Sequence, residues 1–300
     1  MAQKTKTTNY LEYILVILFM GLVRLMPYSW ALRLGSGLGW LVFITWAKRR
    51  QITIHNLAKA FPDKDPAEIK AIALKVYRNI GKTLIEFIAT GEWSKDRLLG
   101  QVSFAGREHL NAALAKGKGV VLLSAHFGNW ELLGIALSAV GYKVNVLARP
   151  LDNPLLDQIV NGIRSKFGTW IIANKNSIKD VIKVLRKNEM IGILMDQNLY
   201  ENAAFVDFFN EAAATTPIIP LLAQKTGVAI IPIRMLRSTN NTFKIIIDPE
   251  MEFKDLPDRQ EYVRINTRLC NEKIEQWIKL DPEQWFWVHN RWKTRPEKNS

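Results

Sequence analysis

The most informative stretch of the chain is Gly119-Val-Val-Leu-Leu-Ser-Ala-His-Phe-Gly-Asn-Trp-Glu131, which continues as Leu-Leu-Gly-Ile-Ala-Leu-Ser-Ala139. Residues 119–125 are apolar and β-branched enough to predict a buried strand. Residues 129–139 have helical periodicity, and Gly141 is a suitable stop. The pattern therefore predicts a strand–turn–helix unit. His126 falls at the carboxyl end of the strand, where open α/β sheets place their chemistry, and Glu131 falls in the first turn of the helix.

The pair His126 and Glu131 has the residue types of a general base and its support. A carboxylate that binds one imidazole nitrogen fixes the tautomer and stabilises the imidazolium, so that the other nitrogen takes a proton from a hydroxyl. We interpret His126 as the candidate base and Glu131 as the residue that turns back to orient it. The alternative is a helix-capping histidine followed by a glutamate that only suits the helix dipole.

The pattern around this unit alternates between strands and helices. Strands are predicted at 119–125, 143–148, 170–173, 190–195, 228–234 and 243–248, and helices at 128–140, 154–166, 176–187, 216–226 and 259–280. Such alternation predicts an α/β fold with a mixed, mostly parallel sheet flanked by helices. We assign residues 99–300 to this catalytic domain and residues 51–98 to a helical segment that packs on it.

The first 50 residues are predicted to form an N-terminal membrane anchor. Residues 10–26 are apolar apart from Glu12 and Arg24, but the uninterrupted apolar stretch, 13–23, is only 11 residues, short of the roughly 20 that span a bilayer. The segment either just spans or lies in the interface, alone or with the apolar run 30–47. The alternative is a pair of buried helices in a soluble domain. The basic residues at 48–50 favour a cytoplasmic location for the domain after them.

The charge and composition restrict the partners. The formal net charge is +13, which favours polyanions, but no nucleic-acid-binding motif occurs, so we expect no nucleic acid. An anionic membrane, a phosphorylated lipid or an acidic carrier protein fits equally well. The single cysteine, Cys270, excludes an internal disulfide. No His-Glu-x-x-His motif occurs and Lys116-Gly-Lys-Gly119 is no Walker loop, so we expect neither a metal nor a cofactor.

Several motifs resemble one enzyme family. A His-x4-Asp/Glu motif after a hydrophobic strand is similar to the signature of the lysophospholipid acyltransferase superfamily, also called glycerolipid acyltransferases. The string His126–Glu131 resembles the bacterial lipid A late-acyltransferase branch, the lauroyl and myristoyl transferases. Further similar segments occur in order along the chain: Arg149-Pro150 with Asn153-Pro154, Asp196-Gln197, Phe205-Val-Asp-Phe-Phe209 with Thr215-Thr216-Pro217, and 282–296. The resemblance covers residues 11–296. It departs at Asn210, where relatives usually carry Gly, and in the Ala-rich stretch 212–214.

The resemblance implies a reaction. A fatty acyl chain would pass from a thioester on acyl carrier protein, or less readily on coenzyme A, to a hydroxyl of a phosphorylated glycolipid, a lipid A precursor. This would occur at the cytoplasmic face of the inner membrane without a cofactor. The implied catalytic residues are His126, Glu131, Arg164 and Asp196. Arg164 would hold the oxyanion, and Asp196 competes with Glu131 as the partner of His126.

Four further residues would bind substrate or shape its pocket: Asn129, Trp130, Arg149 and Gln197. Two alternatives to a lipid A acyltransferase stay open. In the first, the chain belongs to a sister branch of the superfamily, and its acceptor is a mannosylated inositol lipid or a lysophospholipid. In the second, the chain binds lipid without turnover, and the intact pair of His126 and Glu131 counts against this.

Overall fold

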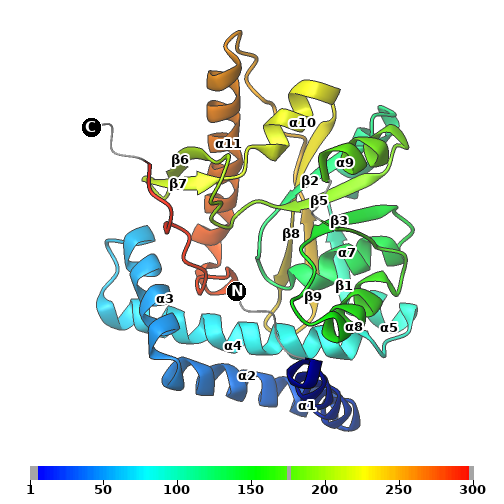
Figure 1. The fold of residues 1–300 in the computed structure, drawn as a ribbon, viewed down its shortest axis with the longest axis vertical. Helices are drawn as coiled ribbons and strands as arrows, with labels where there is room; N and C mark the ends of the chain where they lie inside the picture. Colours follow the sequence, from blue (N-terminus) through cyan, green and yellow to red (C-terminus); the bar gives the residue numbers. More distant parts are fainter. Residues whose placement is uncertain (1–5, 174–176, 297–300) are drawn as a thin grey trace.

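The computed structural model describes residues 6–173 and 177–296 (Figure 1). Five helices precede the first strand: α1 (Lys6–Leu25), α2 (Tyr28–Thr45), α3 (Ala47–Ala60), α4 (Pro66–Thr90) and α5 (Lys95–Leu99). Helix α4 starts where the sequence signals it. Asp65 accepts hydrogen bonds from the backbone of Ala67 and Glu68, and the Glu68 side chain reaches back to the Asp65 backbone. This capping box satisfies backbone donors that the first turn leaves unpaired.

A seven-stranded sheet forms the centre of the molecule. Its strands are β1 (Val102–Ala105), β2 (Val120–Ser124), β3 (Val144–Ala148), β4 (Trp170–Ala173), β5 (Met190–Leu194), β8 (Ala229–Arg237) and β9 (Phe243–Ile247), and their order is β1-β9-β8-β2-β5-β3-β4. Strands β8 and β9 are antiparallel, and every other neighbouring pair is parallel. The predicted fold class, an α/β fold with a mostly parallel sheet, is confirmed.

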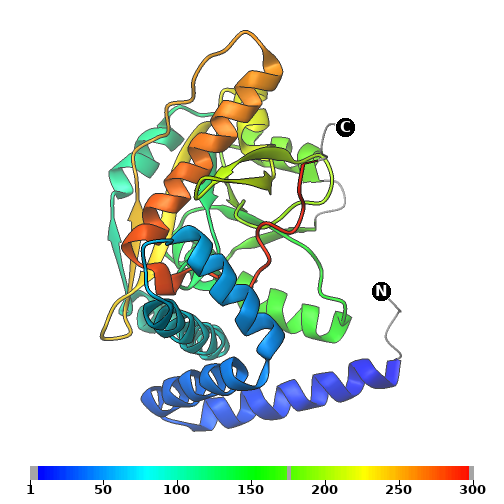
Figure 2. The same ribbon diagram turned by 90° about the vertical axis from the view of Figure 1, so that its left-hand side faces the viewer.

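Helices cover both faces of the sheet (Figures 1 and 2). They are α6 (Arg107–Ala115), α7 (Trp130–Ala139), α8 (Pro154–Ser165), α9 (Ser177–Arg186), α10 (Ile218–Thr226) and α11 (Arg259–Leu280), after which comes a 3-10 turn, η2 (Pro282–Gln284). Strand β2 is buried throughout. Val121 and Leu123 join the core that includes α9, α10 and α11, whereas Val120 and Leu122 join the core under α6 and α7. Because successive side chains of a strand point to opposite faces of the sheet, β2 contributes to the hydrophobic core on each face.

Most predicted elements occur within a few residues of their expected bounds. The expected start of one helix at residue 176 lies outside the described residues. Two features were not predicted: the strand–helix pair β1 and α6, and an antiparallel hairpin of β6 (Ala204–Phe208) and β7 (Glu211–Thr215). Strand β7 reads Glu-Ala-Ala-Ala-Thr. Alanine is depleted in strands, so the segment carries little β signal of its own.

Helices α2 and α4 pack backbone against backbone. A Cβ atom on Gly35 would lie 2.6 Å from the carbonyl oxygen of Gly81, and one on Gly39 would lie 2.1 Å from that of Tyr77. Only glycine allows this approach. The α2 helix is therefore packed tightly onto α4 and is part of the folded body of the protein.

Candidate active site

Sheet register brings His126 and Asp196 together. Strands β2 and β5 are parallel neighbours, and Ser124 pairs with Leu194 at their carboxyl ends. His126 and Asp196 each lie two residues beyond these partners. Two chain segments that are 70 residues apart therefore leave the same edge of the sheet side by side, and both carry a polar side chain there.

Asp196 binds His126 through both of its carboxylate oxygens. Oδ1 lies 2.8 Å from His126 Nδ1, and Oδ2 accepts the backbone N–H of His126 at 3.0 Å. The indole N–H of Trp285 also donates to Oδ2, at 2.7 Å. Burial opposes the charge on Asp196, but the facing His126 and these three donors outweigh it and hold the pKa of the carboxyl below its usual value. The carboxylate is thus ionised and accepts a hydrogen bond from Nδ1–H, which leaves Nε2 as the acceptor nitrogen of the ring.

The Nε2 side of His126 faces the opening of the site. The imidazole is 18% exposed, whereas the Asp196 side chain is 2% exposed. The Nε2 atom of the exposed Gln197 side chain lies 3.2 Å away and donates to His126 Nε2. The rings of Trp130 and Phe286 flank the imidazole at 5.3 and 5.9 Å between centroids. A hydroxyl that replaces the Gln197 amide would meet a basic nitrogen between two aromatic walls.

Glu131 does not turn back to the imidazole, which corrects our expectation. Its two oxygens accept hydrogen bonds from Nε and Nη2 of Arg164, at 2.8 and 2.7 Å. Burial disfavours the guanidinium charge, but the bonded Glu131 outweighs it and raises the pKa of Arg164. The expected neighbours Glu131 and Arg164 are therefore brought together, but as a bidentate ion pair of their own.

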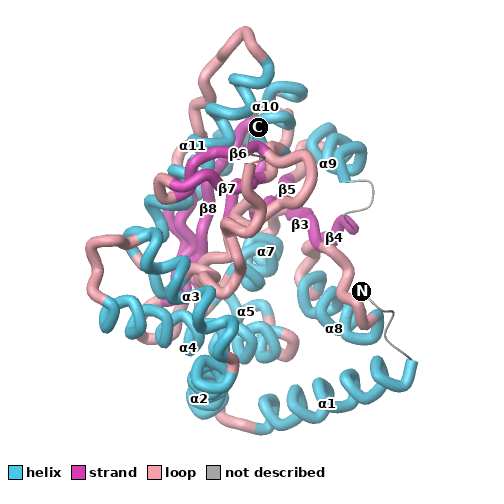
Figure 3. The backbone as a smooth tube through the Cα atoms, turned by 60° about the vertical axis from the view of Figure 1, so that its left-hand side comes forward, coloured by secondary structure: helices cyan, strands magenta, loops and turns pink. Residues whose placement is uncertain are grey.

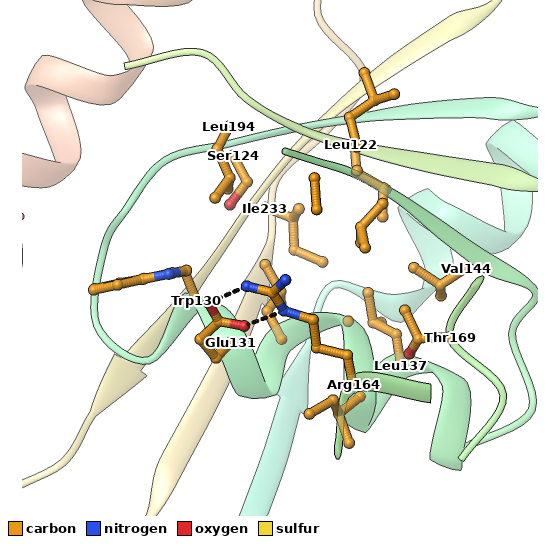
Figure 4. Close-up of a pocket in the computed structure, with 17 residues that line it drawn as sticks. Leu122, Ser124, Trp130, Glu131, Leu137, Val144, Arg164, Thr169, Leu194 and Ile233 are labelled. Carbon is orange, nitrogen blue, oxygen red and sulfur yellow. Dashed lines mark hydrogen bonds and ion pairs between the residues drawn. The ribbon is translucent and has the colours of Figure 1, made fainter. Parts of the chain in front are cut away.

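A pocket lies directly behind the Glu131–Arg164 pair (Figure 4). Its walls are apolar side chains of α7 and of strands β2, β3, β5 and β8, such as Leu122, Leu137, Val144, Leu194 and Ile233. Trp130, Glu131, Arg164 and Ser124 also line the pocket. Because Trp130 also contacts the ring of His126, the pocket and the candidate base share one wall.

Asn129 makes structural contacts within the protein, and its expected contact with substrate remains a prediction. It is fully buried. Its side-chain oxygen caps α7 by accepting the backbone N–H of Leu132, and its Nδ2 donates to Glu86 at 2.7 Å. Glu86 in turn forms a bidentate pair with Arg237 that is almost completely shielded from solvent. This network fixes the turn between His126 and α7 from below.

The closing segment of the chain holds the same turn from the other side. Phe286 donates its backbone N–H to the carbonyl of His126, and Gly128 donates to the carbonyl of Gln284. The sequence drew attention to Trp285 and Phe286 only as members of the segment 282–296, which resembles the family. Glu86 and Arg237 carried no signal, because a buried pair between α4 and β8 requires knowledge of the tertiary structure.

Arg149 is not part of the His126 cluster. Its side chain is 76% exposed and lies 3.4 Å from Asp152. It lines a second, solvent-facing hollow together with Asp157 and Asn161 of α8. Its expected contact with substrate remains a prediction.

Other catalytic chemistry finds little support. Burial raises the pKa of the Cys270 thiol, so this cysteine is a core residue rather than a nucleophile. Within residues 6–173 and 177–296, no group of three or more His, Cys, Asp or Glu side chains is arranged to hold a metal ion.

Comparison with known proteins identifies similar sequences along the whole chain. A family model described as bacterial lipid A biosynthesis acyltransferase matches residues 1–294. The lipid A biosynthesis lauroyltransferase of Escherichia coli (strain K12) is 29% identical over 92% of this chain and 89% of its own length. The palmitoleoyltransferase of the same organism is 26% identical over 90% and 87%, and its myristoyltransferase is 24% identical over 83% and 76%.

Proposed function

Because the chain belongs to the bacterial lipid A biosynthesis acyltransferase family, we propose that it moves a fatty acyl group from an acyl carrier protein thioester to a hydroxyl of a phosphorylated lipid A precursor. The protein is an acyltransferase of lipid A biosynthesis; the donor, the acceptor group and the mechanism are the proposal. One observation carries it. The His126–Asp196 pair leaves Nε2 free of the carboxylate, and the ring of Trp130, which packs against His126, also lines an apolar pocket.

His126 acts as the general base. Its Nε2 takes the proton of the acceptor hydroxyl, and buried Asp196 stabilises the imidazolium that forms. The resulting alkoxide attacks the thioester carbonyl carbon, and a tetrahedral intermediate forms. As the C–S bond breaks, the imidazolium returns the proton to the leaving thiolate. The acyl group moves directly, without an acyl-enzyme intermediate.

Arg164 stabilises the oxyanion, and Glu131 holds Arg164 for that task. Two guanidinium nitrogens are bound to Glu131, and Nη1 is the nitrogen outside this pair. A guanidinium fixed before the reaction costs no reorganisation when the negative charge develops. The role of Glu131 in this proposal is therefore to position Arg164, and that of Asp196 is to support His126.

The acyl chain of the donor occupies the pocket behind this ion pair. The walls are apolar and lie between α7 and the sheet, which suits a hydrocarbon chain. The net charge of +13 suits an acidic carrier protein and an anionic acceptor. A protein with this charge and an exposed apolar N-terminal helix acts at the cytoplasmic face of the inner membrane, where both substrates meet.

The test is acyl transfer by purified protein to a lipid A precursor. His126→Ala should lower the rate by roughly 10²–10⁴-fold. His55→Ala is the matched control, because His55 is exposed on α3, and it should retain the wild-type rate. Acyl carrier protein and coenzyme A thioesters are compared as donors. Retention of more than about a tenth of the rate by His126→Ala would refute the general-base role. A clear preference for coenzyme A would refute the proposed donor.

A further inference from the structure

Helix α1 carries a stripe of exposed leucines. Leu11, Leu15, Leu18, Leu22 and Leu25 are each at least 52% exposed. They recur at intervals of four and three residues, which places them on one face of a helix. On the next helix, α2, Trp30, Leu41 and Ile44 are exposed as well, and so is Trp46 directly after it. A contiguous apolar surface of this kind marks a site of interaction with a membrane or a protein.

Length and composition alone would let α1 cross a bilayer. It has 20 residues, and its most apolar window of 18 residues has a mean hydropathy of 1.4 and is only 11% buried. At about 1.5 Å per residue a 20-residue helix is about 30 Å long, which matches the hydrocarbon thickness. The tertiary contacts of α1 decide between a spanning and an interfacial position.

Both ends of α1 are attached to the body of the protein. Near its N-terminal end, Nδ2 of Asn153 donates to the carbonyl oxygen of Asn9 at 2.9 Å and to Oε2 of Glu12 at 3.1 Å. Near its C-terminal end, Met20 and Val23 are 3% exposed and belong to the core. The helix consequently lies along the surface of the protein, with its first turns close to α8 (Figures 2 and 3).

A spanning α1 would pull a charged loop into the membrane. Asn153 caps α8 and comes after a loop in which the side chains of Arg149 and Asp152 are 76% and 60% exposed. If the N-terminal end of α1 crossed the hydrocarbon region, this loop would have to cross with it. Charged groups in the bilayer interior are costly. The in-plane orientation keeps these charges in water.

A hollow lined by basic and polar side chains lies beside α2. Its glycines fasten it to α4, and both views place α1 and α2 beneath α4 (Figures 1 and 2). The hollow of about 510 Å³ is lined by Arg33, Lys82, Ser29 and Ser36, among others. None of the described residues that line it is acidic. Burial and the nearby Arg237 lower the pKa of Lys82, so an anion near its ammonium group would stabilise the charge.

We propose that α1 and α2 form one membrane-docking face that lies in the plane of an anionic bilayer surface, with α1 inserted along its leucine stripe and not across the bilayer. The apolar stripe enters the boundary between headgroups and acyl chains, as amphipathic interfacial helices do. Lipid phosphates meet the cations beside α2. The donor and acceptor chemistry of the proposed function plays no part in this inference.

Side-specific labelling tests the orientation. Thr7→Cys places a thiol at the exposed start of α1, and Lys187→Cys places one on the exposed end of the α9 region. Both variants are treated with a membrane-impermeant maleimide in right-side-out and inverted membrane vesicles. The unaltered chain, whose only thiol is the buried Cys270, gives the background. We expect both engineered thiols to react in the same vesicle orientation. Reaction of the two thiols in opposite orientations would overturn the proposal.

A second measurement tests the docking face itself. Leu18→Glu puts a charge into the stripe, at a side chain that is 66% exposed, and Ile178→Glu changes a 52% exposed residue on α9, away from the face. We expect Leu18→Glu to weaken co-sedimentation with phosphatidylglycerol vesicles about tenfold or more, because the charge must enter the apolar boundary. Ile178→Glu should bind as the unaltered chain does. Equal binding by both variants would overturn the proposal. Because both positions are exposed, neither change removes a core contact.

Discussion

Asp196 is bound to His126 at two points, the ring and the backbone. One oxygen lies 2.8 Å from Nδ1, and the other accepts the backbone N–H at 3.0 Å. The same carboxylate therefore sets the orientation of the imidazole and the position of the peptide that carries it. Glu131, five residues after His126, is committed to Arg164.

The two carboxylates should differ in their effect on catalysis. Asp196→Asn removes the charge that supports the imidazolium, so kcat should fall by roughly 10²–10⁴-fold, as for the loss of a general base. Glu131→Gln keeps the His126–Asp196 pair and loosens only Arg164, so its loss should be smaller by about tenfold or more. Transfer rates of both purified variants under one assay check this. A larger loss for Glu131→Gln would reverse the two roles.

The sequence predicted four candidate residues but not how they pair. In the structure His126 binds Asp196 and Glu131 binds Arg164, and the catalytic roles of all four remain predictions. The partner of His126 depends on strand order, because β5 must lie next to β2 for Asp196 to face the ring. A single sequence shows that two strands exist but not that they are neighbours. Glu131 was expected to be the partner of His126 because it is close in sequence, whereas Asp196 is the partner because its strand lies next to that of His126.

The buried pair of Glu86 and Arg237 should contribute strongly to stability. Arg237→Met would leave the Glu86 carboxylate buried with the side chain of Asn129 as its remaining charge-neutral donor. Breaking a buried pair by removal of one partner typically costs about 3–5 kcal/mol. We expect a large fall in Tm by circular dichroism in detergent. The control is Arg268→Met, whose pair with Glu272 is about half exposed and should contribute less than about 1 kcal/mol. Similar Tm values for both variants would contradict the prediction.

The stability of the folded protein should decrease as the pH is lowered, because of His289. Its Nε2 accepts the backbone N–H of Asn198 at 2.9 Å, and burial lowers the pKa of His289 to about 4. The unfolded chain binds this proton near pH 6.5, whereas the folded chain resists it. Stability is therefore fully present above about pH 6.5 and declines towards pH 4, by up to about 3 kcal/mol.

His289→Gln tests this assignment. Glutamine does not titrate, so the variant should lose less stability than the unaltered chain between pH 6.5 and 4. The midpoint of urea unfolding, measured across that range, provides the comparison. Parallel pH profiles would assign the acid sensitivity to another group.

Gly134 should control the length of the acyl chain that the pocket accepts. It lies on α7, and a Cβ atom there would lie 3.5 Å from Val146 Cγ1 and 3.6 Å from Thr169 Cγ2. A methyl group fits, but a larger side chain fills the space between α7 and β3. We expect Gly134→Leu to shift the preference towards shorter acyl donors by about tenfold in kcat/KM, roughly the discrimination that one or two methylene groups provide.

The matched control for this pocket is Gly162→Leu. Gly162 is exposed on α8, and a Cβ atom there meets nothing within 4 Å. Its chain-length preference should equal that of the unaltered chain. If Gly134→Leu also leaves the preference unchanged, the acyl chain lies elsewhere.

The backbone contact between α2 and α4 leaves no hinge between the docking helices and the catalytic turn. Gly81 touches α2, and Glu86, five residues further along the same helix, holds Asn129 beside His126. With α1 and α2 docked as proposed, the site would have no hinge with which to move down to a lipid in its leaflet. The proposed acceptor would have to rise towards the enzyme until its hydroxyl reached Nε2. The work of lifting one lipid partly out of its neighbours would then be part of substrate binding, and it would grow with how tightly those neighbours pack.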